Sequence, residues 1–88
     1  MKRTYSIGDV SRQTGISEKQ LRYWEVRGYI PRPDKMVSGK RYLRRYTEFQ
    51  LRFIKTIKNY LDKGYTLPAA IGYARNDRER RGVEYEKN

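Results

Sequence analysis

Long basic side chains and a tyrosine gather in two stretches of this 88-residue chain, and their types suggest contacts to a polyanion. Guanidinium and ammonium groups bind phosphates and the acceptor atoms of base edges, and the free N–H groups at a helix start also favour a phosphate. The first candidate stretch contributes Ser17, Lys19, Gln20, Arg22 and Tyr23. The second contributes Lys40, Arg41, Arg44 and Arg45.

Other kinds of chemistry are excluded by composition. The chain has no cysteine and no histidine, so disulfide frameworks, thiolate metal sites and imidazole catalysis are ruled out. Acid or base catalysis would depend on carboxylates, and no two of them are expected to share an apolar pocket in so small a core. We therefore expect a protein that is not an enzyme and that carries no cofactor or metal.

Charge separates the chain into two parts. Residues 76–88 contain four basic and four acidic side chains, so the whole net charge of +11 lies in residues 1–75. A field this positive favours nucleic acid, with an anionic membrane surface or an acidic protein as alternatives. No apolar run approaches the roughly 20 residues of a membrane span, and the start lacks the apolar segment of a signal peptide. A cytoplasmic protein, associated with the nucleoid, is expected.

Two short helices joined by a tight turn are predicted near the start. Ser6 is a candidate N-cap for a helix over about 7–13, and Gly15 can adopt the positive φ that ends it. Ser17 can then cap a second helix over about 18–27, which ends at Gly28. This arrangement is typical of a helix-turn-helix, whose second helix can lie in the major groove of DNA.

The second helix divides into two faces. Leu21 and Trp24 lie three positions apart and are expected in the core, whereas Arg22 and Tyr23 point outward. Glu25 is expected to be half-buried in a salt bridge with an arginine that follows it in the chain.

A basic hairpin is predicted over about 32–46, with strands near 35–37 and 41–43 around a Ser38-Gly39-Lys40 turn. It holds six basic residues against Asp34 alone, and close like charges repel each other without a counter-ion. A basic hairpin after a recognition helix is the usual form of a wing that reaches the DNA backbone or minor groove.

Two further helices complete the expected fold. Thr47 can cap the third, which ends at Gly64, and the fourth opens at Thr66. From about Asn76 the apolar periodicity stops, which predicts a frayed helix end, a charged tail or the start of a truncated linker over 76–88. The expected fold class is mainly α with a small β-hairpin: a winged helix-turn-helix domain over 1–75, with about four helices and a two-stranded wing.

Four motifs occur in a familiar order: "YSIGDVSRQTGIS", "LRYWEVRGYIP", "LRRYT" and "GYTL". Over roughly residues 4–75 the chain resembles the DNA-binding domain of the MerR family of bacterial transcriptional regulators. The family reads Arg-Tyr-Tyr-Glu where this chain has Arg22-Tyr23-Trp24-Glu25, which implies that Arg22 and Tyr23 face DNA. The family's Tyr-Arg-x-Tyr at the wing matches Arg44 and Tyr46, so the resemblance adds Tyr46 to the DNA-binding candidates. Lys40 and Arg41 are assigned from charge alone.

The resemblance implies sequence-specific binding of double-stranded DNA, at a pseudo-palindromic operator, in transcription regulation. Members dimerise through a long C-terminal helix, so a homodimer is expected for a longer parent chain and a monomer for the isolated domain. Two alternatives share these features of the sequence. One is a small architectural or excisionase-type factor that bends DNA, and the other is an RNA-binding module whose exposed tyrosines stack on unpaired bases.

Overall fold

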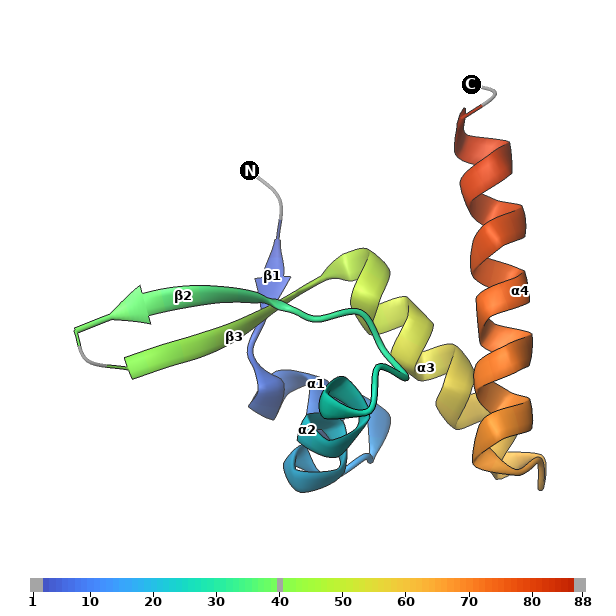
Figure 1. The fold of residues 1–88 in the computed structure, drawn as a ribbon, viewed down its shortest axis with the longest axis horizontal. Helices are drawn as coiled ribbons and strands as arrows, with labels where there is room; N and C mark the ends of the chain where they lie inside the picture. Colours follow the sequence, from blue (N-terminus) through green and yellow to red (C-terminus); the bar gives the residue numbers. More distant parts are fainter. Residues whose placement is uncertain (1–2, 40, 87–88) are drawn as a thin grey trace.

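The structure is a computed structural model that describes residues 3–39 and 41–86, with side chains described except at 34–38, 41–42 and 78–86. The elements are β1 (Thr4–Tyr5), α1 (Ile7–Thr14), α2 (Glu18–Val26), β2 (Asp34–Ser38), β3 (Arg41–Thr47), α3 (Glu48–Asp62) and α4 (Leu67–Glu86). The β2–β3 ribbon projects from the helices, and α4 stands on the side away from it (Figure 1). The expected mainly helical, winged helix-turn-helix fold is confirmed.

A reciprocal cap fixes where α1 begins. The Ser6 hydroxyl accepts the N–H of Asp9 at 3.1 Å, and the Asp9 carboxylate accepts the N–H of Ser6 at 3.2 Å. Two of the free donors at the helix start are thereby satisfied. Gly15 ends α1 with φ 78°, where its N–H donates to the carbonyl of Ser11 at 2.8 Å. A residue with a side chain would be strained in this backbone conformation.

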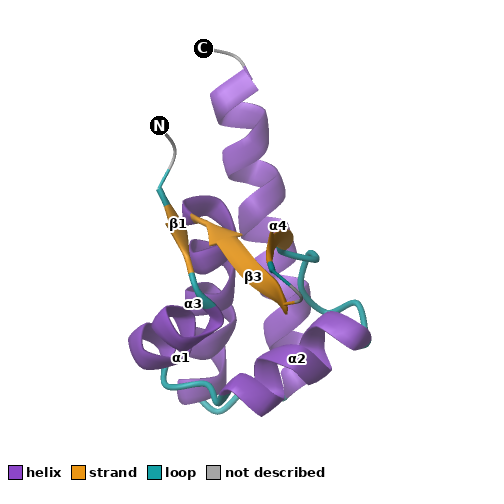
Figure 2. Cartoon of the chain, turned by 90° about the vertical axis from the view of Figure 1, so that its left-hand side faces the viewer, coloured by secondary structure: helices purple, strands orange, loops and turns teal. Residues whose placement is uncertain are grey.

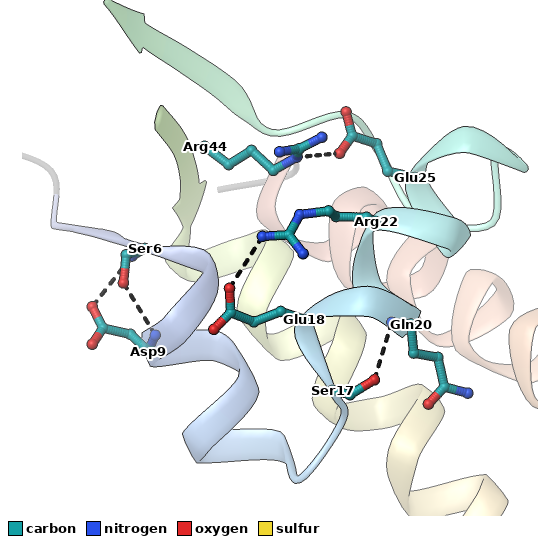
Figure 3. Close-up of polar contacts among 8 residues, drawn as sticks. All are labelled: Ser6, Asp9, Ser17, Glu18, Gln20, Arg22, Glu25 and Arg44. Carbon is teal, nitrogen blue, oxygen red and sulfur yellow. Dashed lines mark hydrogen bonds and ion pairs between the residues drawn. The ribbon is translucent and has the colours of Figure 1, made fainter. Parts of the chain in front are cut away.

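Contacts on both sides of the turn orient α2. The Ser17 hydroxyl accepts the N–H of Gln20 at 3.1 Å, while the Gln20 side chain points outward (Figure 3). Ile16 before the cap and Leu21 after it are both buried, which is the arrangement of a hydrophobic staple. The direction in which α2 leaves the turn is therefore set by neighbouring residues.

The end of α2 is closed by a Schellman motif. Gly28 adopts φ 76°, and its N–H donates to the carbonyl of Glu25 at 3.1 Å. The N–H of Tyr29 donates to the carbonyl of Trp24 at 2.9 Å. The carbonyl of Gly28 accepts a hydrogen bond from Arg75 Nη2 at 3.1 Å. Because Arg75 belongs to α4, this bond ties the last helix to the end of α2.

A third strand, absent from the sequence prediction, widens the sheet. β1 pairs antiparallel with β3, which places Thr4 opposite Thr47 and Tyr5 opposite Tyr46. β3 therefore lies between β1 and β2, and Figure 2 shows β1 beside β3. A strand of two residues is too short to show the alternation of apolar and polar side chains by which strands are predicted. Its hydrogen-bond partners are supplied by β3. The predicted two-stranded wing is correct for β2 and β3, which extend further than expected.

The core lies where α1, α2, α3 and the start of α4 meet. Thr47 and Gln50 cap α3 reciprocally, with bonds of 3.1 and 2.8 Å, as the sequence predicted. The buried apolar side chains are Val10, Ile16, Leu21, Trp24, Ile30, Tyr46, Leu51, Phe53, Ile54, Ile57, Ala70, Ile71 and Ala74. The helix-turn-helix and the sheet thus share a single core with α3 and α4.

Helix α4 continues to Glu86, beyond the point near Asn76 at which the sequence predicted a frayed end or a tail. Apolar periodicity indicates burial of one face rather than helicity itself, and arginine and glutamate are good helix formers. The loss of periodicity therefore did not mark the end of the helix. No helix in the described part of the chain is long and apolar enough to cross a membrane.

Candidate nucleic-acid interface

The outer face of α2 brings together the first set of predicted DNA-binding side chains. Ser17, Lys19 and Gln20 are exposed at the start of the helix. Arg22 and Tyr23 follow on the next turn, with 48% of the Arg22 side chain and 53% of Tyr23 accessible. Polar donors of different lengths thus share one exposed surface, which could meet a groove of DNA.

The opposite face of α2 fixes the helix to the core. Leu21 and Trp24 are both 0% exposed, as the sequence predicted. Neither can rotate outward without exposing a large apolar side chain, so the outer face has one orientation.

An ion pair joins α2 to the β-ribbon. Arg44 Nε donates to Glu25 Oε2 at 2.7 Å, and Glu25 is only 6% exposed (Figure 3). The predicted salt bridge between Glu25 and an arginine of the hairpin is confirmed. Because a buried carboxylate requires a partner, this pair holds β3 at a defined distance from α2. Arg44 is thus an internal contact of the domain; a contact between Arg44 and DNA stays a prediction.

Tyr46 is a correction to the predicted site. The resemblance placed it among the DNA-binding residues, but its side chain is 0% exposed and belongs to the core. Burial and the nearby Glu25 carboxylate raise the pKa of the Tyr46 phenol to about 12. A wholly buried ring cannot reach DNA unless the core opens, so Tyr46 supports the junction between β3 and α3 instead.

Arg45 points to the other side of the sheet from Arg44, because successive side chains of a strand alternate. Its Nε and Nη2 donate to the hydroxyl of Thr4 at 3.1 and 3.0 Å. Arg45 therefore joins β3 to β1 rather than to α2. A contact between Arg45 and a phosphate stays a prediction.

Two predicted residues near the end of the ribbon are not placed by the structure. Lys40 lies outside the described residues. Arg41 begins β3 opposite Ser38, but its side chain also lies outside what is described.

A further aromatic and basic group adjoins the predicted site. The rings of Tyr23 and Tyr29 meet edge to face with centroids 6.4 Å apart, and the Arg27 guanidinium lies 5.9 Å from the Tyr29 centroid. A hydrogen bond to Tyr29 raises the pKa of Arg27. The turn at Gly28 was the signal for this group, since it folds Tyr29 back beside the helix. Neither Arg27 nor Tyr29 is among the candidates that the sequence suggests.

One acid also lies on the α2 surface. Glu18 Oε1 pairs with Arg22 Nη2 at 3.2 Å, at the four-residue spacing that brings side chains together on a helix. That spacing was a signal for the pair in the sequence. Among the described residues, no group of acidic, histidine or cysteine side chains could hold a metal ion.

Taken together, these features define a winged helix-turn-helix domain with a polar outer helix face. Residues 5–77 match the family described as MerR HTH family regulatory protein, and the chain belongs to that family. The resemblance noted in the sequence is thereby confirmed. The family consists of regulatory proteins, which also confirms that the chain is not an enzyme.

Three relatives illustrate the match. The HTH-type transcriptional regulator YyaN of Bacillus subtilis is 36% identical over 63 residues, covering 72% of this chain and 44% of the relative. The mercuric resistance operon regulatory protein of Bacillus cereus is 32% identical over 63 residues, covering 72% and 46%. The HTH-type transcriptional regulator AdhR of B. subtilis is 34% identical over 84 residues, covering 94% and 58%. The chain thus spans about half the length of these relatives.

A solved structure has the same fold. HiNmlR, described as a MerR family regulator lacking the sensor domain and bound to promoter DNA, superposes with a TM-score of 0.66. The match covers 97% of this chain and 67% of that one, at 22% sequence identity. At this identity the likeness establishes the fold.

Proposed function

We propose that this chain binds double-stranded DNA sequence-specifically and acts in transcription regulation. Helix α2 enters the major groove, and the β2–β3 ribbon lies along the backbone or the adjacent minor groove. The observation that carries the proposal is the outer face of α2, where the side chains of Lys19, Gln20, Arg22 and Tyr23 are all exposed. The opposite face of the helix is packed into the core. Membership of the MerR family supports the same reading.

Each part of the proposed interface has a physical role. Arg22 can donate two hydrogen bonds to a guanine edge, and Gln20 can pair with adenine. Lys19 can reach a phosphate beside the groove. Arg44 sets the position of the ribbon through Glu25, so that the arginines and lysines of the wing reach the backbone beside α2.

A pseudo-palindromic operator has two half-sites and can bind two copies of the domain. A single domain of this size contacts one half-site, so we place the full function in a homodimer of a longer parent chain on a pseudo-palindromic operator. The isolated domain is then a monomer that binds weakly. Its place of action is the cytoplasm, where it associates with the nucleoid.

The test is selection of fragments from random-sequence duplex DNA by the purified chain, followed by sequencing. A shared short sequence, repeated with inverted symmetry where two copies bind, is the expected result. Enrichment of no sequence would overturn the proposal. Competition with single-stranded RNA separates it from an RNA-binding module, since RNA that displaces the selected duplex at equal concentration would favour the latter. Equal bending of selected and scrambled duplexes would favour an architectural factor.

A further inference from the structure

Glu18 is an acid on a surface otherwise suited to a polyanion. It occupies the first turn of α2, where its side chain is 46% exposed and its Oε1 accepts from Arg22 Nη2 at 3.2 Å (Figure 3). The chain carries 21 basic residues and 10 acidic ones, so a carboxylate at this position lowers the attraction of α2 for any phosphate.

The second carboxylate oxygen of Glu18 lies near the first turn of α1. A Cβ on Gly8 would lie 3.9 Å from Glu18 Oε2 and 3.5 Å from Arg12 Nη1. These distances are ordinary van der Waals contacts, and the first turn of a helix favours a negative charge nearby. One oxygen of Glu18 therefore lies near the start of α1 while the other pairs with Arg22.

Phosphates and base edges respond differently to such a pair. A phosphate offers acceptors and negative charge only, so a fixed carboxylate repels every phosphate, whatever the sequence. A base edge is neutral and offers donors as well, such as the amino groups of cytosine and adenine. Arg22 can turn its remaining donors to a guanine while Glu18 stays in place, but moving onto a phosphate would bring Glu18 close to that phosphate.

We propose that Glu18 determines sequence specificity: by holding Arg22 and repelling phosphates, it makes α2 favour base edges over the DNA backbone. Glu18 acts through Arg22 and is a positioning residue. The inference rests on the proposed DNA binding.

The experiment compares Glu18→Gln with the parent chain on two duplexes of equal length, the selected sequence and its scrambled version, by fluorescence anisotropy at several salt concentrations. Affinity for the scrambled duplex should rise roughly two- to five-fold, the size of one exposed charge interaction. Affinity for the selected duplex should rise less or fall. The ratio of the two affinities should therefore drop.

Glu48→Gln is the matched control. Glu48 also lies in the first turn of a helix and pairs with an arginine four residues on, Arg52, at 3.4 Å with similar exposure. Glu48→Gln changes the net charge by the same amount as Glu18→Gln. We expect it to leave the ratio of affinities for the two duplexes unchanged. A ratio that falls equally in Glu48→Gln and Glu18→Gln would overturn the inference, because net charge would then explain the effect.

A double substitution tests the route through Arg22. In the Arg22→Ala background, Glu18→Gln should no longer change the ratio, whereas a persistent change would overturn the positioning role. Thermal melts of each variant check that the fold is intact. If the parent chain itself shows no preference between the duplexes, the proposed function fails. If the parent prefers its site and Glu18→Gln leaves that preference unchanged, only this inference fails.

Discussion

Arg22 and Trp24 are two positions apart on α2, and the period of the helix sends them to opposite sides. Nearly half of the Arg22 side chain is accessible, whereas Trp24 is completely buried. One substitution at each position should therefore affect a different property of the protein, binding at the first and folding at the second.

Arg22→Ala should lower affinity for the selected duplex by about 1–3 kcal/mol, because a guanidinium that contacts a base or phosphate is lost. Fluorescence anisotropy at fixed salt measures this change. Arg52→Ala is the control, since Arg52 forms a similar exposed pair on α3, with Glu48. Equal affinities of the parent and Arg22→Ala would remove Arg22 from the interface.

Trp24→Ala should lower the free energy of unfolding by about 3–5 kcal/mol, because it opens a cavity in the core. Tyr23→Ala, at the exposed neighbouring position, should cost less, about 0.5–1.5 kcal/mol, through loss of the edge-to-face contact with Tyr29. Urea titrations of the three proteins make the comparison. Similar unfolding midpoints for both variants would contradict the buried position of Trp24.

At the level of elements, Glu25 and Arg44 connect α2 with β3. Arg44→Ala leaves a nearly buried carboxylate without its partner, which should cost about 1.5–3 kcal/mol of stability. In a Glu25→Ala background the same substitution should cost less, because no carboxylate is left unpaired. Urea titrations of the four proteins measure the coupling, and additive effects would mean that the pair does not join the two elements.

The cap of α1 makes a pH-dependent contribution. Hydrogen bonds from Ser6 lower the pKa of Asp9 from its ordinary value of 3.8. A depressed pKa means that the native state favours the ionised carboxylate, so the stabilisation is present above pH 3.8 and is lost as pH falls through the lower native pKa. Asp9→Asn should therefore melt at a lower temperature than the parent at pH 7, and the gap should narrow toward pH 2. A constant gap across that range would contradict this role.

At the level of the whole molecule, the net charge of +11 predicts strong salt dependence of DNA binding. With ~6 phosphate contacts, affinity should fall by about three decades between 50 and 200 mM salt. Arg44→Ala and Arg45→Ala should each make the salt slope shallower by about one if the residue binds a phosphate. Since both arginines also make internal contacts, an unchanged slope would assign them to the fold alone.

Local patterns in the sequence were enough to predict the helices and the faces of α2. Caps at Ser6, Ser17 and Thr47 and turns at Gly15, Gly28 and Gly64 depend on neighbours within a few residues. Such interactions are visible in the sequence because the groups that form them are close along the chain. The inward position of Trp24 followed from helical periodicity for the same reason.

Contacts between distant residues were decided only by the tertiary structure. β1 exists because β3 passes beside it, and Arg45 reaches Thr4 across 41 positions of the chain. Tyr46 was misassigned because the motif match that added it to the candidates does not show whether the side chain is buried in the core. Local sequence patterns were sufficient to predict where α1, α2 and α3 begin and end and which face of α2 is buried, but not where α4 ends. Which arginines remain available to DNA depended on how the sheet packs against α2, since burial and ion pairing arise only once the elements meet.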